Sequence, residues 1–281
     1  MSYATIVLHL QPDAEPGTAS EDLAIRLANL FEAHLIGMAT PDRTPFSLAM
    51  STGMSADPAF QAAIERNQAL AVARCDHLAA RARAAGFSDL GMTIVDDGTV
   101  ANLTKSSRCC DLLILTRPHD RGVSHGWSID LLGEVLLQSV APVLVVPPGL
   151  DARQMGEHVL IGWNGSPEAA RAVAGALPVL RRARRVTLLQ CDPAFDVRRT
   201  DGVEALEAPR SWLARHGIQV EAWLEPTADD PGETLLKQAG RLGADLVVMG
   251  AWGHWRWTER LLGGATRSVL QRSTLPVLMS H

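Results

Sequence analysis

An internal repeat constrains the fold of this chain more than any other feature. Asp111 begins the apolar run DLLILT, which precedes a Pro-Val-Leu segment at Pro142. Asp245 begins the run DLVVMG and precedes a second Pro-Val-Leu segment, at Pro276, by the same interval. Self-similarity of this kind indicates two copies of one design.

Each copy alternates apolar runs with Ala- and Leu-rich helical stretches, which predicts an α/β fold with a parallel sheet covered by helices. In the first copy we predict strands near 4–10, 34–39, 90–96, 111–116 and 142–146, and helices near 19–33, 57–85, 99–109 and 129–139. In the second we predict strands near 158–163, 185–190, 218–224, 245–250 and 276–280, and helices near 167–181, 203–216, 231–242 and 265–272. Each copy is thus expected to be a five-stranded parallel sheet flanked by helices.

The boundary between the copies is predicted at Pro147-Pro148-Gly149, because this triplet continues no strand and opens no helix. We therefore expect two domains, residues 1–149 (the first half) and 150–281 (the second half). The first half also carries an insertion at residues 41–56, rich in Thr, Ser, Met and Pro, which we expect to be a mobile loop.

Composition excludes several classes of protein. A chain of 281 residues with 47% hydrophobic and 20% charged residues is typical of a globular protein with a full core. The formal net charge of −5 gives no basic field for nucleic acid. The one basic cluster, residues 181–185, falls where a predicted helix ends, and cations there are expected from the helix dipole alone.

The cysteines and the N-terminus point to the cytoplasm. The four cysteines, Cys75, Cys109, Cys110 and Cys191, form no Cys-x-x-Cys pair, which favours a reducing compartment and argues against a zinc site. The sequence begins without a basic signal region, and no run approaches the ~18 apolar residues of a membrane span. We expect a cytoplasmic protein with neither membrane nor nucleic-acid partners.

Three glycines in the second half have a spacing suited to a nucleotide's phosphates. Gly250 follows a predicted strand, Gly253 comes three residues later, and Gly263 stands just before a predicted helix. Glycine allows close approach of the backbone to a ligand, and the N–H groups at a helix N-terminus favour an anion. Thr266 adds a hydroxyl donor. The competing interpretation is that these glycines only end a strand and start a helix.

This arrangement resembles the nucleotide loop of the ATP-binding branch of the universal stress protein family, whose fold is adenine nucleotide alpha hydrolase-like. The family pattern has Ser or Thr after the third glycine, where this chain has Gly264, and Asp after the first strand, where it has Asn164. The resemblance covers nearly the whole chain as a tandem pair. It implies a stress-response regulatory protein that binds ATP, or a related adenine nucleotide, with or without magnesium.

The resemblance assigns the nucleotide contacts to the second half. Cys191 is matched to a backbone contact with adenine, and Trp252 either stacks on the base or packs its own loop onto the body. The candidate nucleotide-binding residues are Gly162, Trp163, Asn164, Cys191, Met249, Gly250, Trp252, Gly253, Gly263, Gly264, Ala265 and Thr266.

The first half is expected to be a degenerate copy. Gln11 follows its first strand, and Thr116, Arg117, Pro118 and His119 replace the phosphate glycines. The sequence Leu131-Leu132-Gly133 echoes Leu261-Leu262-Gly263, but it is shifted by four residues, which predicts a longer loop and a shorter segment after it. Because members of the family pair through their last strands, the halves are expected to form an intrachain pseudo-dimer, and the chain a possible homodimer.

No catalytic set is recognisable, since the sequence contains no Gly-x-Ser-x-Gly, no His-Glu-x-x-His and no phosphate-loop lysine motif. We expect no enzyme beyond slow, incidental ATP hydrolysis, and no metal site. Asn164-Gly165-Ser166-Pro167 does not match the glycine loop of the related nucleotidyl transferases. The alternative is a scaffold of the same family that binds a protein partner or a small apolar ligand. Gly264 and Asn164 favour that alternative, whereas the glycine spacing and Thr266 favour the nucleotide.

Overall fold

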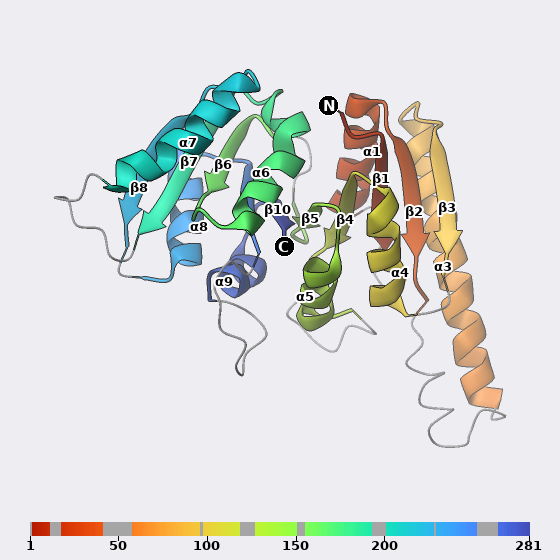
Figure 1. Cartoon of the computed structure of the whole chain (residues 1–281). Coiled ribbons are helices and arrows are strands. Elements are labelled where there is room, and N and C mark those ends of the chain that lie inside the picture. Colours follow the sequence, from red (N-terminus) through yellow and green to blue (C-terminus); the bar gives the residue numbers. More distant parts are fainter. Residues whose placement is uncertain are drawn as a thin grey trace.

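The ten strands that the structure describes form one continuous sheet in a computed structural model of the protein (Figure 1). The described residues are 2–11, 18–41, 58–95, 98–118, 127–150, 155–192, 201–227, 229–251 and 264–281. The strand order is β3-β2-β1-β4-β5-β10-β9-β6-β7-β8. The predicted insertion, apart from its first residue, lies outside the described residues.

Strands and helices alternate in both halves. The first half contains β1 (Thr5–Leu10), α1 (Ala19–Phe31), β2 (His34–Ala39), α3 (Pro58–Ala84), β3 (Leu90–Ile94), α4 (Thr99–Ser106), the short 3-10 helix η1 (Ser107–Cys109), β4 (Leu112–Thr116), α5 (Ile129–Gln138) and β5 (Val143–Val146). The second contains β6 (His158–Gly162), α6 (Pro167–Leu180), β7 (Arg185–Asp192), α7 (Asp201–Arg215), β8 (Glu221–Pro226), α8 (Pro231–Leu242), β9 (Leu246–Gly250), α9 (Gly264–Arg272) and β10 (Val277–Ser280). The predicted element types are confirmed, with bounds that differ by a few residues.

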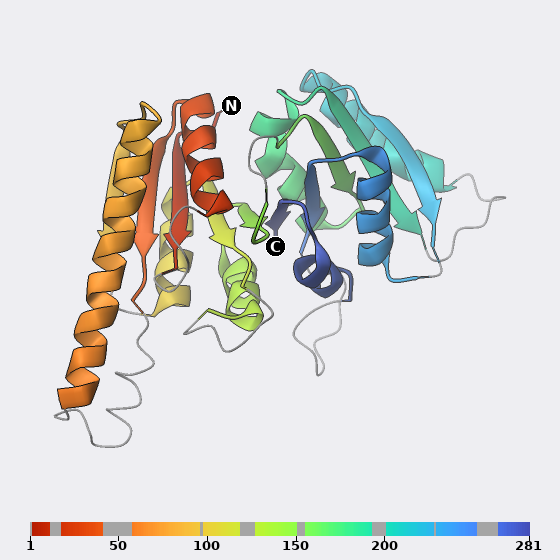
Figure 2. The same cartoon turned by 180° about the vertical axis from the view of Figure 1, so that it is seen from behind.

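Two helical layers cover the sheet. Side chains of α1, α3, α6 and α7 pack in one core, for example Leu23, Leu78, Val173 and Leu213. Side chains of α4, α5, α8 and α9 pack in the other, for example Leu103, Val135, Leu235 and Val269. The helices therefore lie on both faces of the sheet, as parallel strands with crossover helices require (Figure 2).

The two halves meet in the middle of the sheet. Among the described strands, all pairs are parallel except β5 with β10, which pair antiparallel with Leu144 opposite Leu278. The hydroxyl of Tyr3 donates to the carbonyl of Gly175 in α6 at 2.8 Å. Arg117, which follows β4, donates through Nη1 to the carbonyl of Ser273 at 2.6 Å, just after α9 ends. Arg117 thus joins the halves, a role that the sequence did not suggest.

The repeat is visible in the hydrogen bonds. The amide of Asp111 donates to the carbonyl of Thr5 at 2.9 Å, and that of Asp245 to His158 at 3.0 Å. Each carboxylate also accepts from backbone N–H groups where the first strand of its half begins: Asp111 from Thr5, and Asp245 from His158. The strand registers therefore give equivalent residues in the two halves.

One predicted correspondence reaches outside the described residues. Gly133 lies inside α5, which buries Leu132 and Gly133 as part of its apolar face. Leu261, Leu262 and Gly263, to which the sequence matches them, are not among the described residues, and the described part of α9 begins at Gly264. The expected difference in length between the two loops therefore stays a prediction.

Candidate functional site

The candidate site lies at the carboxyl ends of β6, β7 and β9. These strands are neighbours in the order β9-β6-β7, and Gly162 at the end of β6 is paired with Met249. The chain leaves β6 for β7 on one side, while β9 lies on the other, so this is a switch point of the kind where open α/β sheets bind ligands. Trp252, Gly253 and Gly263 lie outside the described residues.

The loop after β6 is shaped by local hydrogen bonds. The amide of Trp163 donates to the carbonyl of Leu189 at 2.8 Å, which continues the pairing with β7. Asn164 is exposed, and its Oδ1 accepts from the amide of Ser166 at 3.1 Å. Ser166 in turn caps α6 by accepting from the amide of Ala169 at 3.1 Å. The side-chain oxygen of Asn164 is therefore already used within its own loop.

Two of the glycines that are predicted to bind the nucleotide allow helices to pack closely against the strand ends. A Cβ at Gly250 would lie 2.5 Å from the amide nitrogen of Ala169 and 2.8 Å from the carbonyl carbon of Glu168. A Cβ at Gly162 would lie 2.8 Å from Leu235 of α8. These glycines bring α6 and α8 close to the strand ends, so the structural interpretation of Gly250 has a direct physical basis.

The start of α9 faces a carboxylate. Gly264 is exposed, and a Cβ there would lie 3.0 Å from Oδ2 of Asp230. Asp230 caps α8 through Oδ1, which accepts from the amide of Glu233 at 3.0 Å. Gly232 lets the two helix starts meet, since a Cβ on it would lie 2.4 Å from the carbonyl oxygen of Ala265. Thr266 is buried in the first turn of α9.

Asp230 also connects this helix start to β7. Burial raises the pKa of the Cys191 thiol to about 11, and the carboxylates of Glu225 and Asp230 contribute to the rise. Asp230 thus lies beside Gly264 and within electrostatic range of Cys191. Sequence reasoning missed Asp230; its position directly before Pro231, as a helix N-cap, was the available signal.

The equivalent place in the first half is filled by side chains. The register matches His9 to Gly162 and Thr40 to Cys191. His9 is buried, its Nε2 lies 2.8 Å from Oγ1 of Thr40, and its ring meets Trp127 edge-on with centroids 4.7 Å apart. Trp127 and Gln11 both donate to the carbonyl of Thr116, at 2.9 and 3.1 Å.

Burial lowers the pKa of His9 to about 3, so its ring is neutral in this apolar layer. The three residues that fill the place, His9, Thr40 and Trp127, were not among the predicted ones, although counting along the repeat from β6 would have found His9. His119 lies outside the described residues.

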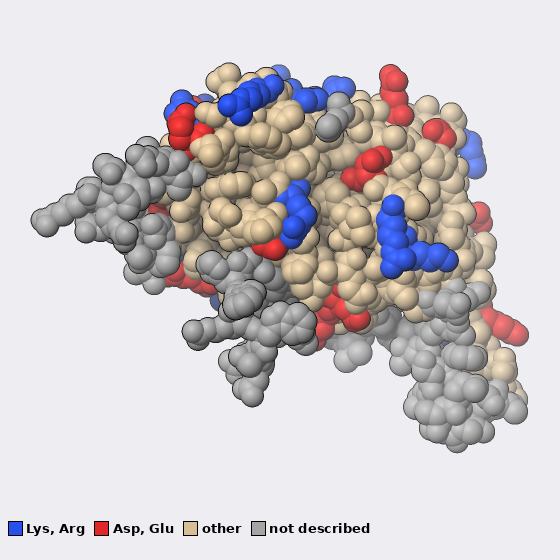
Figure 3. Space-filling view, in the orientation of Figure 1, with Lys and Arg blue, Asp and Glu red and all other residues tan. Residues whose placement is uncertain are grey.

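Other site classes find no support in the described part of the chain. No group of three or more His, Cys, Asp or Glu residues there is arranged to hold a metal ion. No helix among the described residues is long and apolar enough to cross a membrane. On the face drawn in Figure 3, basic and acidic side chains are interspersed.

The comparisons with known proteins agree with this geometry. No curated protein matches the sequence. A universal stress protein from Archaeoglobus fulgidus DSM 4304 is similar over 98% of this chain and 97% of its own, with a TM-score of 0.73 and 18% identity. A protein of unknown function from Pseudomonas aeruginosa PAO1 is similar over 98% of this chain and 92% of its own, with a TM-score of 0.62 and 19% identity. These likenesses establish the fold. The Universal stress protein family model matches residues 155–281, so this part of the chain is a universal stress protein family domain.

Proposed function

We propose that the second half binds an adenine nucleotide at the carboxyl ends of β6, β7 and β9. We further propose that the chain is a regulatory, stress-response protein that responds to nucleotide binding and does not depend on nucleotide hydrolysis. The observation that carries the proposal is the N-terminus of α9. Its first residue, Gly264, lies beside Asp230, which also acts on Cys191 at the end of β7. A helix start at a strand switch point is a general anion site, and the exposed Asn164 borders it.

The carboxylate of Asp230 decides which form of the nucleotide fits. Two like unit charges 4 Å apart repel by roughly 1–4 kcal/mol at the effective dielectric constants of a protein surface. Asp230 would therefore weaken the binding of a triphosphate without magnesium, whereas it would attract a divalent cation beside the phosphates. The residues present fit a magnesium nucleotide better than a free one, and magnesium would neutralise the negative charge that the phosphates and Asp230 bring together.

The side chains around this site favour binding without hydrolysis. The thiol of Cys191 stays protonated at neutral pH because burial and nearby carboxylates raise its pKa to about 11, so it is not a nucleophile. Asn164 already accepts a hydrogen bond within its loop. His158 begins β6 and so lies at the amino end of that strand, whereas the site lies at its carboxyl end, too far away for His158 to act as a general base.

Calorimetric titration of the full chain with ATP, with and without magnesium, tests the proposal. The wild type is expected to bind one nucleotide per chain when magnesium is present. Asp230→Asn keeps a side-chain oxygen for the helix cap but removes the charge, so binding without magnesium should tighten about tenfold. Asp229→Asn is the matched control, because Asp229 is exposed and paired with Lys237 at 3.1 Å. Absence of binding at millimolar ATP with magnesium would refute the proposal.

The same titration separates the second candidate function, a scaffold for a protein partner or a small apolar ligand. Two observations favour it: Asp230 faces the helix start, and Asn164 is used within its loop. If ATP binds in neither condition and Asp230→Asn changes nothing, the scaffold becomes the better interpretation. Mass analysis of any nucleotide released on denaturing the purified protein gives an independent result.

A further inference from the structure

A buried arginine in the first half has hydrogen-bond donors without acceptors among the described residues. Arg74 of α3 has a side chain only 5% exposed, and its Nη2 donates to Oε1 of Glu21. Its Nε and Nη1 are buried, and no atom in the described part of the chain accepts from them. A buried N–H group without a partner costs ~1–3 kcal/mol, and more when the group is charged. An acceptor on a bound ligand would remove this cost.

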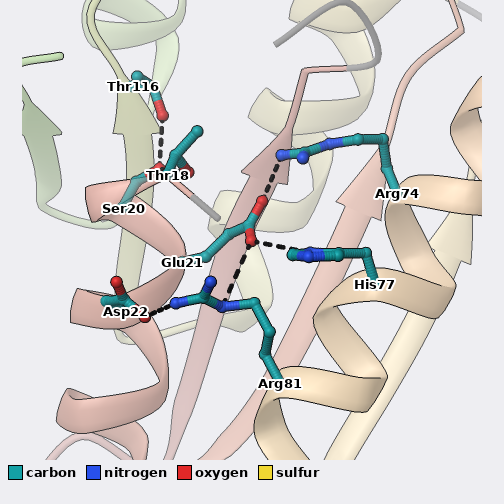
Figure 4. A network of polar contacts seen from close by, with 8 residues as sticks. All are labelled: Thr18, Ser20, Glu21, Asp22, Arg74, His77, Arg81 and Thr116. Carbon is teal, nitrogen blue, oxygen red and sulfur yellow. Dashed lines mark hydrogen bonds and ion pairs between the residues drawn. The ribbon is translucent and has the colours of Figure 1, made fainter. Parts of the chain in front are cut away.

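The guanidinium of Arg74 lies where ligands enter α/β sheets. Glu21, its partner, is in the first turn of α1. The neighbouring Ser20 reaches the end of β4, since its Oγ lies 2.7 Å from Oγ1 of Thr116. Arg74 is therefore at the carboxyl ends of the first-half strands and beside the positive end of a 13-residue helix (Figure 4).

The start of α1 is capped by a backbone carbonyl, since the amides of Glu21 and Asp22 donate to the carbonyl of Thr18, and not by a side chain. Thr18 is its N-cap residue but makes no side-chain capping bond to the described part of the helix, and its Oγ1 lies 2.8 Å from Oγ of Ser20 instead. By contrast, the N-cap Ser166 of α6, the equivalent helix, closes onto the amide of Ala169. The first turn of α1 thus lacks the side-chain cap that α6 receives from its own N-cap residue.

Cationic side chains gather around the buried carboxylate of Glu21. Glu21 is fully buried, and three cationic or ionisable groups converge on it: Arg74, Arg81 with Nε at 4.0 Å, and His77 with Nδ1 at 3.5 Å. Arg81 also pairs with Asp22. The buried carboxylate of Glu21 therefore faces two guanidinium groups, and two of the three nitrogens of Arg74 find no acceptor in the described part of the chain.

A purely structural ion pair would not need this geometry. Lysine could neutralise Glu21 with a single contact, whereas the guanidinium of Arg74 has further N–H groups on Nε and Nη1, which point in different directions. The nucleotide site proposed above lies in the other half, so this feature is independent of it.

We propose that the first half has an oxyanion site in which Arg74 binds a phosphate or carboxylate group of a small ligand at the N-terminus of α1. The donor is Nε or Nη1 of Arg74, which point in different directions, and the hydroxyls of Thr18 and Ser20 lie at the start of the same helix. The first half, a degenerate copy with respect to the nucleotide, would thereby sense a second and different ligand.

Thermal unfolding and calorimetry of the full chain with inorganic phosphate, and separately with acetate, test the site against chloride of equal ionic strength. For the wild type, one or both anions should raise the unfolding midpoint, and the anion that raises it more identifies the ligand class. Arg74→Lys keeps the charge opposite Glu21 but loses the remaining guanidinium N–H donors, so affinity should fall about tenfold. Arg184→Lys is the matched control, because Arg184 is 85% exposed and pairs with Glu157 at the surface.

A second variant guards against misfolding. The double variant Glu21→Gln/Arg74→Gln removes both buried charges together, and it should fold and lose the anion response. Two results would overturn the proposal: neither anion stabilises the wild type more than chloride does, or Arg74→Lys and the double variant respond as strongly as the wild type.

Discussion

Replacing Gly250 by alanine is expected to destabilise the fold, whatever ligand the site binds. The new Cβ would lie 2.5 Å from the amide nitrogen of Ala169, where ordinary contacts begin at 3.4 Å. The obstacle is the backbone of α6 rather than a flexible side chain, so the helix must retreat by nearly 1 Å. Overpacking of this kind costs typically ~1–3 kcal/mol, and we expect the upper end because the buried Ala172 and Val173 move with the helix.

Urea denaturation followed by circular dichroism measures this effect. We expect a midpoint shift equivalent to about 3 kcal/mol with an unchanged slope, since the surface exposed on unfolding stays the same. Gly240→Ala is the matched control: Gly240 is exposed in α8, no described atom lies within 4 Å of the position that its new methyl group would take, and the change should stabilise by roughly 0.5–1 kcal/mol. Equal stability of Gly250→Ala and the wild type would refute the packing argument.

Three further predictions concern stability. Burial lowers the pKa of His9 to about 3 from an unfolded value near 6.5, so below pH 6.5 protons bind preferentially to the unfolded state and the folded state loses stability. Between pH 7 and pH 5 the unfolding free energy of the wild type should fall by roughly 2 kcal/mol more than that of His9→Gln. An equal fall in both proteins would disprove the neutral buried ring. Asp245→Ala should cost about 2–4 kcal/mol in urea denaturation, since Gly156 and His158 lose an acceptor, and a cost below about 1 kcal/mol would contradict it. Tyr3→Phe should cost about 1 kcal/mol by loss of its bond to Gly175, and no change would show that this contact between the halves is not stabilising.

The element pattern was predictable because each signal was local. The Ser166-Pro167 start of α6 and the apolar run of β9 are visible in the sequence, and the structure places both within a residue or two of the prediction. β8 shows the limit: the strand begins at Glu221, although the apolar Ile218 and Val220, which are buried, favoured a start at 218. Apolar residues alone do not distinguish a strand from the segment that precedes it.

The candidate site was less predictable because it depends on contacts between distant segments. The glycine spacing placed Gly250 and Gly264 correctly at a strand end and a helix start, but it could not show that Gly250 is fitted against α6. Nor could it show the carboxylate of Asp230 beside Gly264, because the two are far apart in sequence. Arg74 gave no signal at all, since a single arginine in a long helix is ordinary.

The two halves show how one design can be given different chemistry at equivalent positions. Where Gly250 lets α6 lie against the end of β9, the first half has Thr116, whose hydroxyl meets Ser20 at the start of α1. Where Gly162 admits Leu235, the first half has His9, held by Thr40 and covered by Trp127. The larger side chains fill the helix face on which the second half keeps its candidate site.

The exchange of Gly250 for Thr116 favours the proposed oxyanion site on the other face of the sheet, which α1 and α3 cover. With a hydroxyl pair in place of a glycine contact, the start of α1 is joined to β4 through side chains, and Glu21 is placed to receive Arg74 from α3. The equivalent position in α6 is the buried Ala169, which offers no such partner. His9 and Thr40 fill the place equivalent to the candidate nucleotide site, whereas Thr116 and Glu21 support the polar cluster around Arg74. Because the two proposed sites use different residues in different halves, nucleotide and oxyanion binding should respond independently to variants.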